Sequence, residues 1–226
     1  MATSGTTSFN MDFTEIAEEA WERAGQEMRT GYGLRTARRS MNLLTIEWQN
    51  RGLNMWTIEE GVLPLTQGTL TYDLPADTID LIEQGIRTGT GQQQSDLSIS
   101  RISVSTYSSI PNKLVQGRPI QLYIDRGRDN PTVTVYPIPD RDIYSLYYWR
   151  MRRIEDAGSG VQTADVNFRF LPCLVAGLAY YIAMKVPELA PRLPILKQDY
   201  EEQFRLASEE DREKAPVRFV PRLRGY

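Results

Sequence analysis

The spacing of the apolar residues changes near Gly52, and this change limits the folds that the chain can adopt. Before Gly52, apolar residues recur at steps of three and four, which indicates one face of an amphipathic helix. These residues are Leu34, Ala37, Met41, Leu44 and Trp48. Gly52 tolerates left-handed backbone angles and therefore favours a helix end at this point. Beyond it, residues 57–65 and 69–74 read as strands, and the Gly-containing segment 66–68 predicts a hairpin between them.

Further helices are expected around this one. The first begins at Asp12, where Glu15 follows at the spacing of a capping box. The third begins near Pro172, because proline fits the first turn of a helix, and the fourth covers about residues 195–213. The first two helices cannot bury their apolar faces alone, so we expect the chain to return to a helical layer after an insertion. The predicted class is α+β, with a disordered lead (1–11), a helical bundle (12–52 and 166–213), an inserted antiparallel β-rich domain (53–157) and an extended C-terminal arm (214–226).

Four more segments of the insertion are predicted as strands from their β-branched and aromatic residues. They are residues 80–87, 120–125, 132–136 and 144–151. Aromatic side chains fall on both faces of the last one, among them Tyr144, Tyr147 and Trp149. Two interpretations remain open: a strand covered on both sides within the chain, or a strand that contacts another subunit.

The third predicted helix is apolar around nearly its whole circumference. Leu178, Tyr181 and Ile182 belong to this apolar surface, and charge returns only at Lys185. A helix of this kind is buried on all sides. In a chain of 226 residues, it lies either at the centre of the helical bundle or at a subunit interface.

The second predicted helix carries three arginines, Arg35, Arg38 and Arg39, away from its apolar stripe. One interpretation is an ordinary solvated face, because most charged side chains are exposed. The other interpretation is a subunit interface, in which these arginines contact the acidic first helix of a neighbouring copy.

The C-terminal segment APVRFVPRLRGY differs from the rest of the chain. Its two prolines prevent a helix, and it contains no acidic residue. Apolar and basic side chains are interleaved along it, and the candidate contact residues are Val217, Arg218, Phe219, Val220, Arg222, Leu223, Arg224 and Tyr226. The segment is either a frayed terminus or an arm that binds a partner, by strand addition or by filling apolar pockets.

The composition removes most catalytic chemistry. The chain has no histidine and a single cysteine, Cys173, which excludes a Ser-His-Asp triad, a Cys-His dyad and the usual zinc sites. The adjacent acids Glu59 and Glu60 point in different directions and do not form a convergent pair for glycoside hydrolysis. The net charge of −3 gives no global attraction to DNA or to an anionic membrane. We therefore expect no enzymatic activity, no metal, no cofactor and no membrane partner.

Three blocks of the sequence carry a family resemblance. The first is LLTIEWQNRGLNMWTIEEGVLPLTQGTLTYDLP, the second is RISVSTYSSIPNKLVQGRPIQLYIDRGRDNPTVTVYPIPD, and the third is LPCLVAGLAYYIAMK followed by LKQDYEEQFRLASEEDREKAP. Together they span roughly residues 12–216. The pattern resembles the head-to-tail adaptor, or connector, proteins of short-tailed bacteriophages, of the tail tubular protein A and packaged-DNA-stabilisation type.

The resemblance implies a structural role in the virion, between the portal and the tail. Such adaptors form a ring, usually of twelve subunits, that joins the portal protein to the tail tube or nozzle and helps to retain packaged DNA. For this chain, it implies that the C-terminal arm binds the portal and that the β region, with Tyr144, Tyr147 and Trp149, faces the tail. It also implies assembly in the host cytoplasm and passage of DNA through the channel without sequence-specific binding. The alternative is a virion-associated cell-wall hydrolase that uses an acid such as Glu59 or Glu60.

Overall fold

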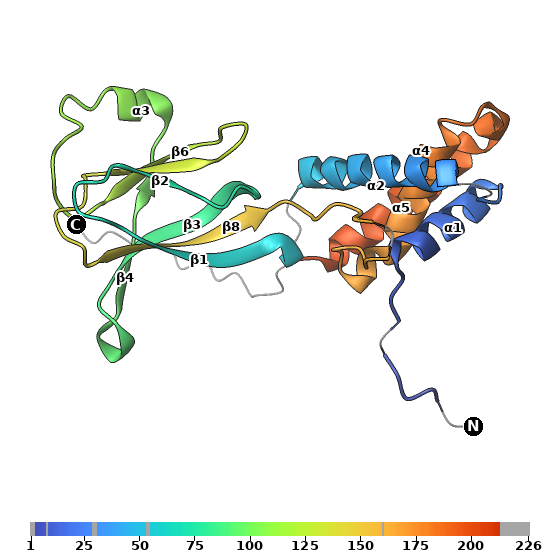
Figure 1. Ribbon diagram of the computed structural model, residues 1–226, viewed down its shortest axis with the longest axis horizontal. Coiled ribbons are helices and arrows are strands. Elements are labelled where there is room, and N and C mark those ends of the chain that lie inside the picture. Colours follow the sequence, from blue (N-terminus) through green and yellow to red (C-terminus); the bar gives the residue numbers. More distant parts are fainter. Residues whose placement is uncertain (1–2, 8, 29–30, 53–54, 160, 213–226) are drawn as a thin grey trace, which may run out of the picture. The chain divides into compact units, whose positions relative to one another are not determined.

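The computed structural model describes residues 3–7, 9–28, 31–52, 55–159 and 161–212 (Figure 1). Its residues separate into two compact units. The helical unit comprises Met1–Met55 and Glu155–Tyr226, and the β unit comprises Trp56–Ile154. Helices and two largely antiparallel sheets occur together in the chain, so the predicted α+β class is confirmed.

The helical unit begins with α1 (Phe13–Ala24) and α2 (Gly31–Arg51). The capping box predicted at the start of α1 is confirmed. The backbone N–H of Glu15 donates to the Asp12 carboxylate at 2.9 Å, and the Asp12 N–H donates to the Glu15 carboxylate at 3.0 Å. These bonds satisfy backbone donors that a helix start otherwise leaves without a partner.

The centre of the helical unit is α4 (Leu171–Ala183), which packs against α1, α2 and α5 (Leu193–Glu210). Close packing at this point depends on Gly177, because a Cβ there would lie 2.9 Å from side-chain atoms of both Leu44 and Tyr200. Short 3₁₀ turns complete the unit at η3 (Phe168–Phe170) and η4 (Pro187–Arg192). The apolar surface of α4 is therefore buried against helices of its own chain.

The β unit contains two four-stranded sheets. In the first sheet the order is β1 (Ile58–Pro64), β8 (Tyr144–Arg152), β3 (Thr78–Thr88) and β4 (Ser95–Ser98). In the second sheet the order is β2 (Thr71–Asp73), β7 (Thr132–Tyr136), β6 (Gln121–Asp125) and β5 (Ser100–Arg101). The remaining elements of the unit are η1 (Met55–Thr57, which starts at the end of the helical unit), η2 (Gly91–Gln93) and α3 (Val104–Ser108).

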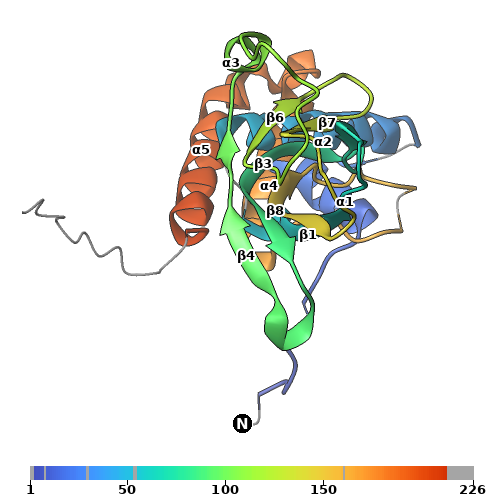
Figure 2. The same ribbon diagram turned by 90° about the vertical axis from the view of Figure 1, so that its left-hand side faces the viewer.

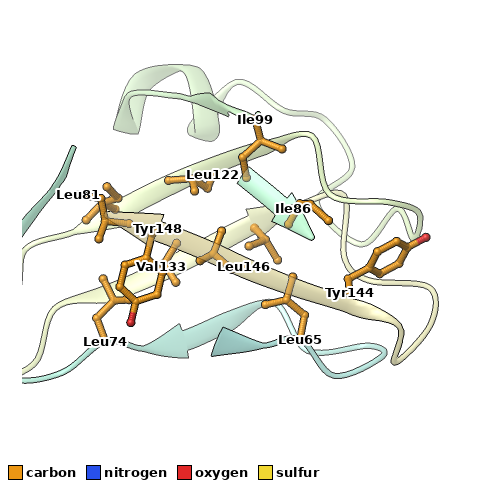
Figure 3. Close-up of a cluster of buried hydrophobic side chains, with 12 residues drawn as sticks. Leu65, Leu74, Leu81, Ile86, Ile99, Leu122, Val133, Tyr144, Leu146 and Tyr148 are labelled. Atoms are coloured by element: carbon orange, nitrogen blue, oxygen red, sulfur yellow. The ribbon is translucent and has the colours of Figure 1, made fainter. Parts of the chain in front are cut away.

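A single cluster of apolar side chains fills the space between the two sheets (Figure 3). The first sheet contributes Leu81, Ile86 and Leu146, and the second contributes Leu122 and Val133. All five side chains are buried, with exposed fractions of 4 % or less. The sheets are therefore held together by apolar burial, the main favourable term in folding.

One segment passes from the first sheet to the second in the middle of an extended run (Figure 2). The N–H of Ile99 donates to the Gln84 carbonyl in the first sheet, and the N–H of Ser100 donates to the Ile120 carbonyl beside the second. The side chain of Ile99 is 5 % exposed and belongs to the core. This crossing connects β4 to β5 without a loop between them.

The hairpin predicted around residues 66–68 is wrong. The two strands exist, but β1 pairs with β8 and β2 pairs with β7, so they lie in different sheets. Leu65 and Leu74, which flank the segment, are both buried in the core between the sheets. The Tyr72 hydroxyl accepts from the N–H of Thr66 and donates to nearby carbonyls, and these bonds hold the segment between β1 and β2 in place. The path of the chain between β1 and β2 is therefore determined by the burial of both leucines and not by local turn residues.

Candidate interaction surfaces

The outward face of α2 carries two arginines that have no hydrogen bond or ion pair with the described parts of the chain, Arg35 and Arg39. Both side chains are exposed. Tyr32, Leu43 and Ile46 lie on the same face at helical spacing, with exposed fractions of 67, 55 and 53 %. We call this face the α2 stripe (Tyr32, Arg35, Arg39, Leu43 and Ile46). It is both basic and apolar, which is typical of a surface that binds a partner.

Further positive charge lies beside the α2 stripe. Arg38 is half-buried, and its Nη2 donates to the Ser159 carbonyl at 2.9 Å. Lys185 donates from Nζ to the Ser40 hydroxyl at 2.7 Å. Burial lowers the pKa of Lys185, and the nearby charge of Arg39 lowers it further. These contacts concentrate cations on one side of the helical unit.

Contacts between α2 and α5, one of them buried, fix the direction of the α2 stripe. The indole N–H of Trp48 donates to the hydroxyl of Tyr200 on α5 at 3.0 Å. Arg51 pairs with Glu201 of α5 at 2.9 Å and with Glu47 of its own helix. The hydrogen bond from Arg51 to Glu201 is the largest cause that raises the pKa of Arg51, so this guanidinium stays charged. Because α2 and α5 are held together in this way, their outward faces have fixed directions.

The sequence offered Leu178, Tyr181 and Ile182 as candidate interface residues, with the centre of the bundle as the other interpretation. In the structure they lie inside the helical unit. Leu178 and Ile182 are 0 % exposed. Tyr181 is half-buried, and its hydroxyl donates to Glu47 at 2.6 Å. Burial, followed by this hydrogen bond, raises the pKa of Tyr181 to about 12. Leu178 and Ile182 are therefore not available to a neighbouring subunit, because α1, α2 and α5 already cover α4.

The aromatic side chains of β8 divide between the two faces of the first sheet. Tyr144 is 8 % exposed and lies in the core between the sheets (Figure 3). Tyr147 and Trp149 are in the alternate register, and Trp149 is 42 % exposed. Tyr147 covers Gly85 of β3, where a Cβ would lie 2.3 Å from the Tyr147 hydroxyl oxygen. Of the three aromatic residues predicted to face the tail, only Tyr147 and Trp149 are thus on the outer face.

The outer face of the first sheet also carries aliphatic residues that sequence reasoning missed. Val62 pairs with Tyr147 across β1 and β8 and is 49 % exposed, and Ile82 of β3 is 40 % exposed. On α2, the exposed residues Leu43 and Ile46 were also not predicted from the sequence as contact residues. Their positions outside the main apolar stripe of the helix were the available signal, since apolar residues away from the buried face point to a second contact.

Comparison with known protein families identifies the family of the chain. The family model of the SU10 adaptor protein matches residues 11–220, nearly the whole chain. The chain belongs to the SU10 adaptor protein family. No curated protein matches it. The resemblance to phage head-to-tail adaptors is thereby confirmed, and with it an adaptor role in a phage particle.

The C-terminal arm of this SU10 adaptor lies outside the described residues. This applies to the whole set of arm residues named from the sequence, which are Val217, Arg218, Phe219, Val220, Arg222, Leu223, Arg224 and Tyr226. The family match extends to residue 220 and so includes the first part of this segment. Portal binding by the arm therefore stays a prediction.

The acids considered for a hydrolase are engaged by arginines. Glu59 accepts hydrogen bonds from Arg150 at 2.9 Å and from Arg152 at 2.7 Å. Glu60 lies 3.7 Å from Arg87. A general acid in glycoside hydrolysis instead donates a proton to the leaving-group oxygen. The arrangement at Glu59 supports a structural ion-pair network across β1 and β8.

Other carboxyl groups also accept hydrogen bonds from arginines. The pKa values of Asp77 and Glu201 are lowered, chiefly by hydrogen bonds from Arg150 and Arg51 respectively. Both groups are therefore held as carboxylates. Within the described residues, no group of three or more His, Cys, Asp or Glu side chains is arranged to hold a metal ion.

Family membership places this SU10 adaptor at the neck of the virion. It also implies contact with portal and tail components. Among the described helices, none has both the length and the apolar character needed to cross a bilayer. The described residues offer two candidate surfaces for these contacts, the α2 stripe and the outer face of the first sheet.

Proposed function

We propose that this SU10 adaptor forms a homo-oligomeric ring of about twelve copies that joins the portal protein to the tail tube or nozzle and helps to retain packaged DNA. The observation that carries the proposal is the family match over residues 11–220, which includes residues of both units. The role is structural, and it requires no catalysis.

Subunit contacts in the ring involve the exposed arginines of α2. Arg35 and Arg39 have no partner in the described part of their own chain, and Arg38 lies beside them. A surface that differs from the one it binds produces head-to-tail association, which closes into a ring when the rotation allows it. The basic and apolar character of the α2 stripe supports such a contact.

The C-terminal arm and the first sheet bind different proteins. The C-terminal arm binds the portal, because its interleaved arginines and apolar residues suit strand addition or pocket filling. The outer face of the first sheet, with Tyr147 and Trp149, binds the tail tube or nozzle. Aromatic residues in a partly exposed patch are common at the centre of protein interfaces.

Packaged DNA passes through the ring without sequence-specific binding. The net charge of −3 supports this role, since strong affinity for DNA depends on phosphate contacts with many cations. The ring is assembled onto the portal in the host cytoplasm and then remains in the neck of the virion.

Deletion of residues 215–226 tests the proposal. We expect the truncated chain to lose about 100-fold or more in affinity for its portal protein, because the arm supplies the main contact. Deletion of residues 1–7 is the matched control and leaves portal affinity unchanged. Surface plasmon resonance on immobilised portal rings measures both. Undiminished affinity of the arm-deleted chain would contradict the proposed role of the arm.

A further inference from the structure

The outward face of α5 carries a second stripe of exposed residues. Ile195 is 72 % exposed and Leu206 is 48 % exposed. Glu202 is exposed and has no hydrogen bond or ion pair with the described residues. With Gln198 and Glu209, which are also exposed, these residues form what we call the α5 stripe (Ile195, Gln198, Glu202, Leu206 and Glu209). It is acidic and apolar.

The α5 stripe has the same spacing as the α2 stripe. From Tyr32 to Ile46 and from Ile195 to Glu209, exposed residues recur at steps of three, four, four and three. Each stripe is therefore about 21 Å long at the rise of an α-helix. The spacing is symmetric about the central residue of each stripe. When the stripes are aligned, Arg39 and Glu202 therefore face each other whether the two helices run parallel or antiparallel.

We infer that the α2 stripe of one copy packs against the α5 stripe of a second copy, with Arg39 opposite Glu202 at the centre of the contact. This inference rests on the proposed ring and names the surfaces that would form it. The two stripes match in charge at their centres, where Arg39 meets Glu202, and the α5 stripe carries a second acid, Glu209. They also match in apolar content, because Leu43 and Ile46 meet the helix that exposes Ile195 and Leu206.

The acidic helix α1 is a poorer partner for the α2 stripe. Its exposed residues are Glu15, Glu18, Glu19 and Glu22. No large apolar side chain of α1 is among the exposed ones in the described chain. Contact with α1 would leave the apolar residues of the α2 stripe against carboxylates, which is unfavourable because buried charge without a partner is costly. Helix α5 is therefore a better partner for the α2 stripe than the acidic first helix considered from the sequence.

A chain cannot satisfy both stripes by itself. Trp48 and Tyr200 join α2 to α5 through the buried faces opposite the stripes, and Arg51 and Glu201 join the helices at the flank. Each copy therefore presents one basic stripe and one acidic stripe in fixed directions. Such a pair of unlike surfaces leads to head-to-tail association between copies, the kind of contact that a ring requires.

Charge exchange at the central pair tests the inference. Full-length chains carrying Arg39→Glu, Glu202→Arg, or both are mixed with portal protein and with one another, and the oligomers are measured by native mass spectrometry. Arg128→Glu, on an exposed loop of the β unit, is the matched control for charge reversal. We expect each single variant to lower the apparent association constant between copies by about tenfold or more, and the double variant to recover it. The control assembles like the wild type.

The outcomes separate this inference from the proposed function. Single variants that assemble like the wild type, or a double variant as weak as the singles, would overturn the α2–α5 contact while leaving the ring intact. A wild-type chain that stays monomeric with and without portal protein would overturn the ring and the contact together. Circular dichroism of each variant establishes that a loss of assembly does not come from unfolding.

Discussion

Leu178→Ala tests whether α4 is the core of a single subunit or a surface between subunits. The Leu178 side chain is 0 % exposed, and α1, α2 and α5 surround its helix. Truncation removes apolar contacts and leaves a cavity, which the three flanking helices prevent from collapsing. Leu-to-Ala changes at such sites cost about 3–4 kcal/mol in the free energy of unfolding.

This loss corresponds to a fall in melting temperature of about 10 °C for a chain of this size. Urea titration at a protein concentration low enough to give monomers measures it, with far-UV circular dichroism as the probe of helix content. Leu206→Ala is the matched control, because this α5 leucine is 48 % exposed. Its expected effect on monomer stability is below about 0.5 kcal/mol.

Two results with these leucine variants would contradict the structure of the helical unit described above. If Leu178→Ala leaves monomer stability within about 0.5 kcal/mol of the wild type and weakens only the association between copies, α4 is an interface helix. If Leu206→Ala destabilises the monomer as much as Leu178→Ala does, the outward direction of the α5 stripe is wrong.

Two further predictions follow from buried and paired polar groups. Tyr200→Phe removes the acceptor of the Trp48 N–H, and because both side chains are at most 1 % exposed, we expect a loss of about 1–3 kcal/mol in urea titration. A cost below about 0.5 kcal/mol would mean that this hydrogen bond contributes little. The second prediction concerns pH. The hydrogen bond from Arg150 lowers the pKa of Asp77 in the folded β unit, so the stability it contributes is present above about pH 4, the pKa in the unfolded chain, and is lost as the pH falls through the lowered value. Asp77→Asn should therefore flatten the fall in stability between neutral and acid pH, and an unchanged pH profile would contradict this.

Local chemistry in the sequence predicted the ends of several elements. Asp12 and Glu15 predicted the start of α1, because a capping box depends only on residues three apart. Pro172 lies in the first turn of α4, as expected. The alternating run of residues 132–136 coincides with β7. For the two helix starts, the determining interactions lie within a few residues along the chain.

Pairing and burial partners were harder to predict. The segment 66–68 resembles a hairpin loop whether the strands beside it pair with each other or with strands far along the chain. Only the joint burial of Leu65 and Leu74 between the sheets decides this, and that burial depends on the whole β unit. Likewise, an apolar helix is compatible with a core or with an interface, so Leu178 alone could not distinguish them. Exposed apolar residues of the helical unit lie on the α2 stripe, at Leu43 and Ile46, and on the α5 stripe, at Ile195 and Leu206.

Electron cryo-microscopy of the full-length adaptor bound to its portal protein tests the central claim most directly. The account predicts a closed ring of adaptor copies in which α2 of each copy contacts α5 of the next and the C-terminal arm lies on the portal. Adaptor copies that bind the portal singly, with no contact between neighbouring helical units, would contradict it.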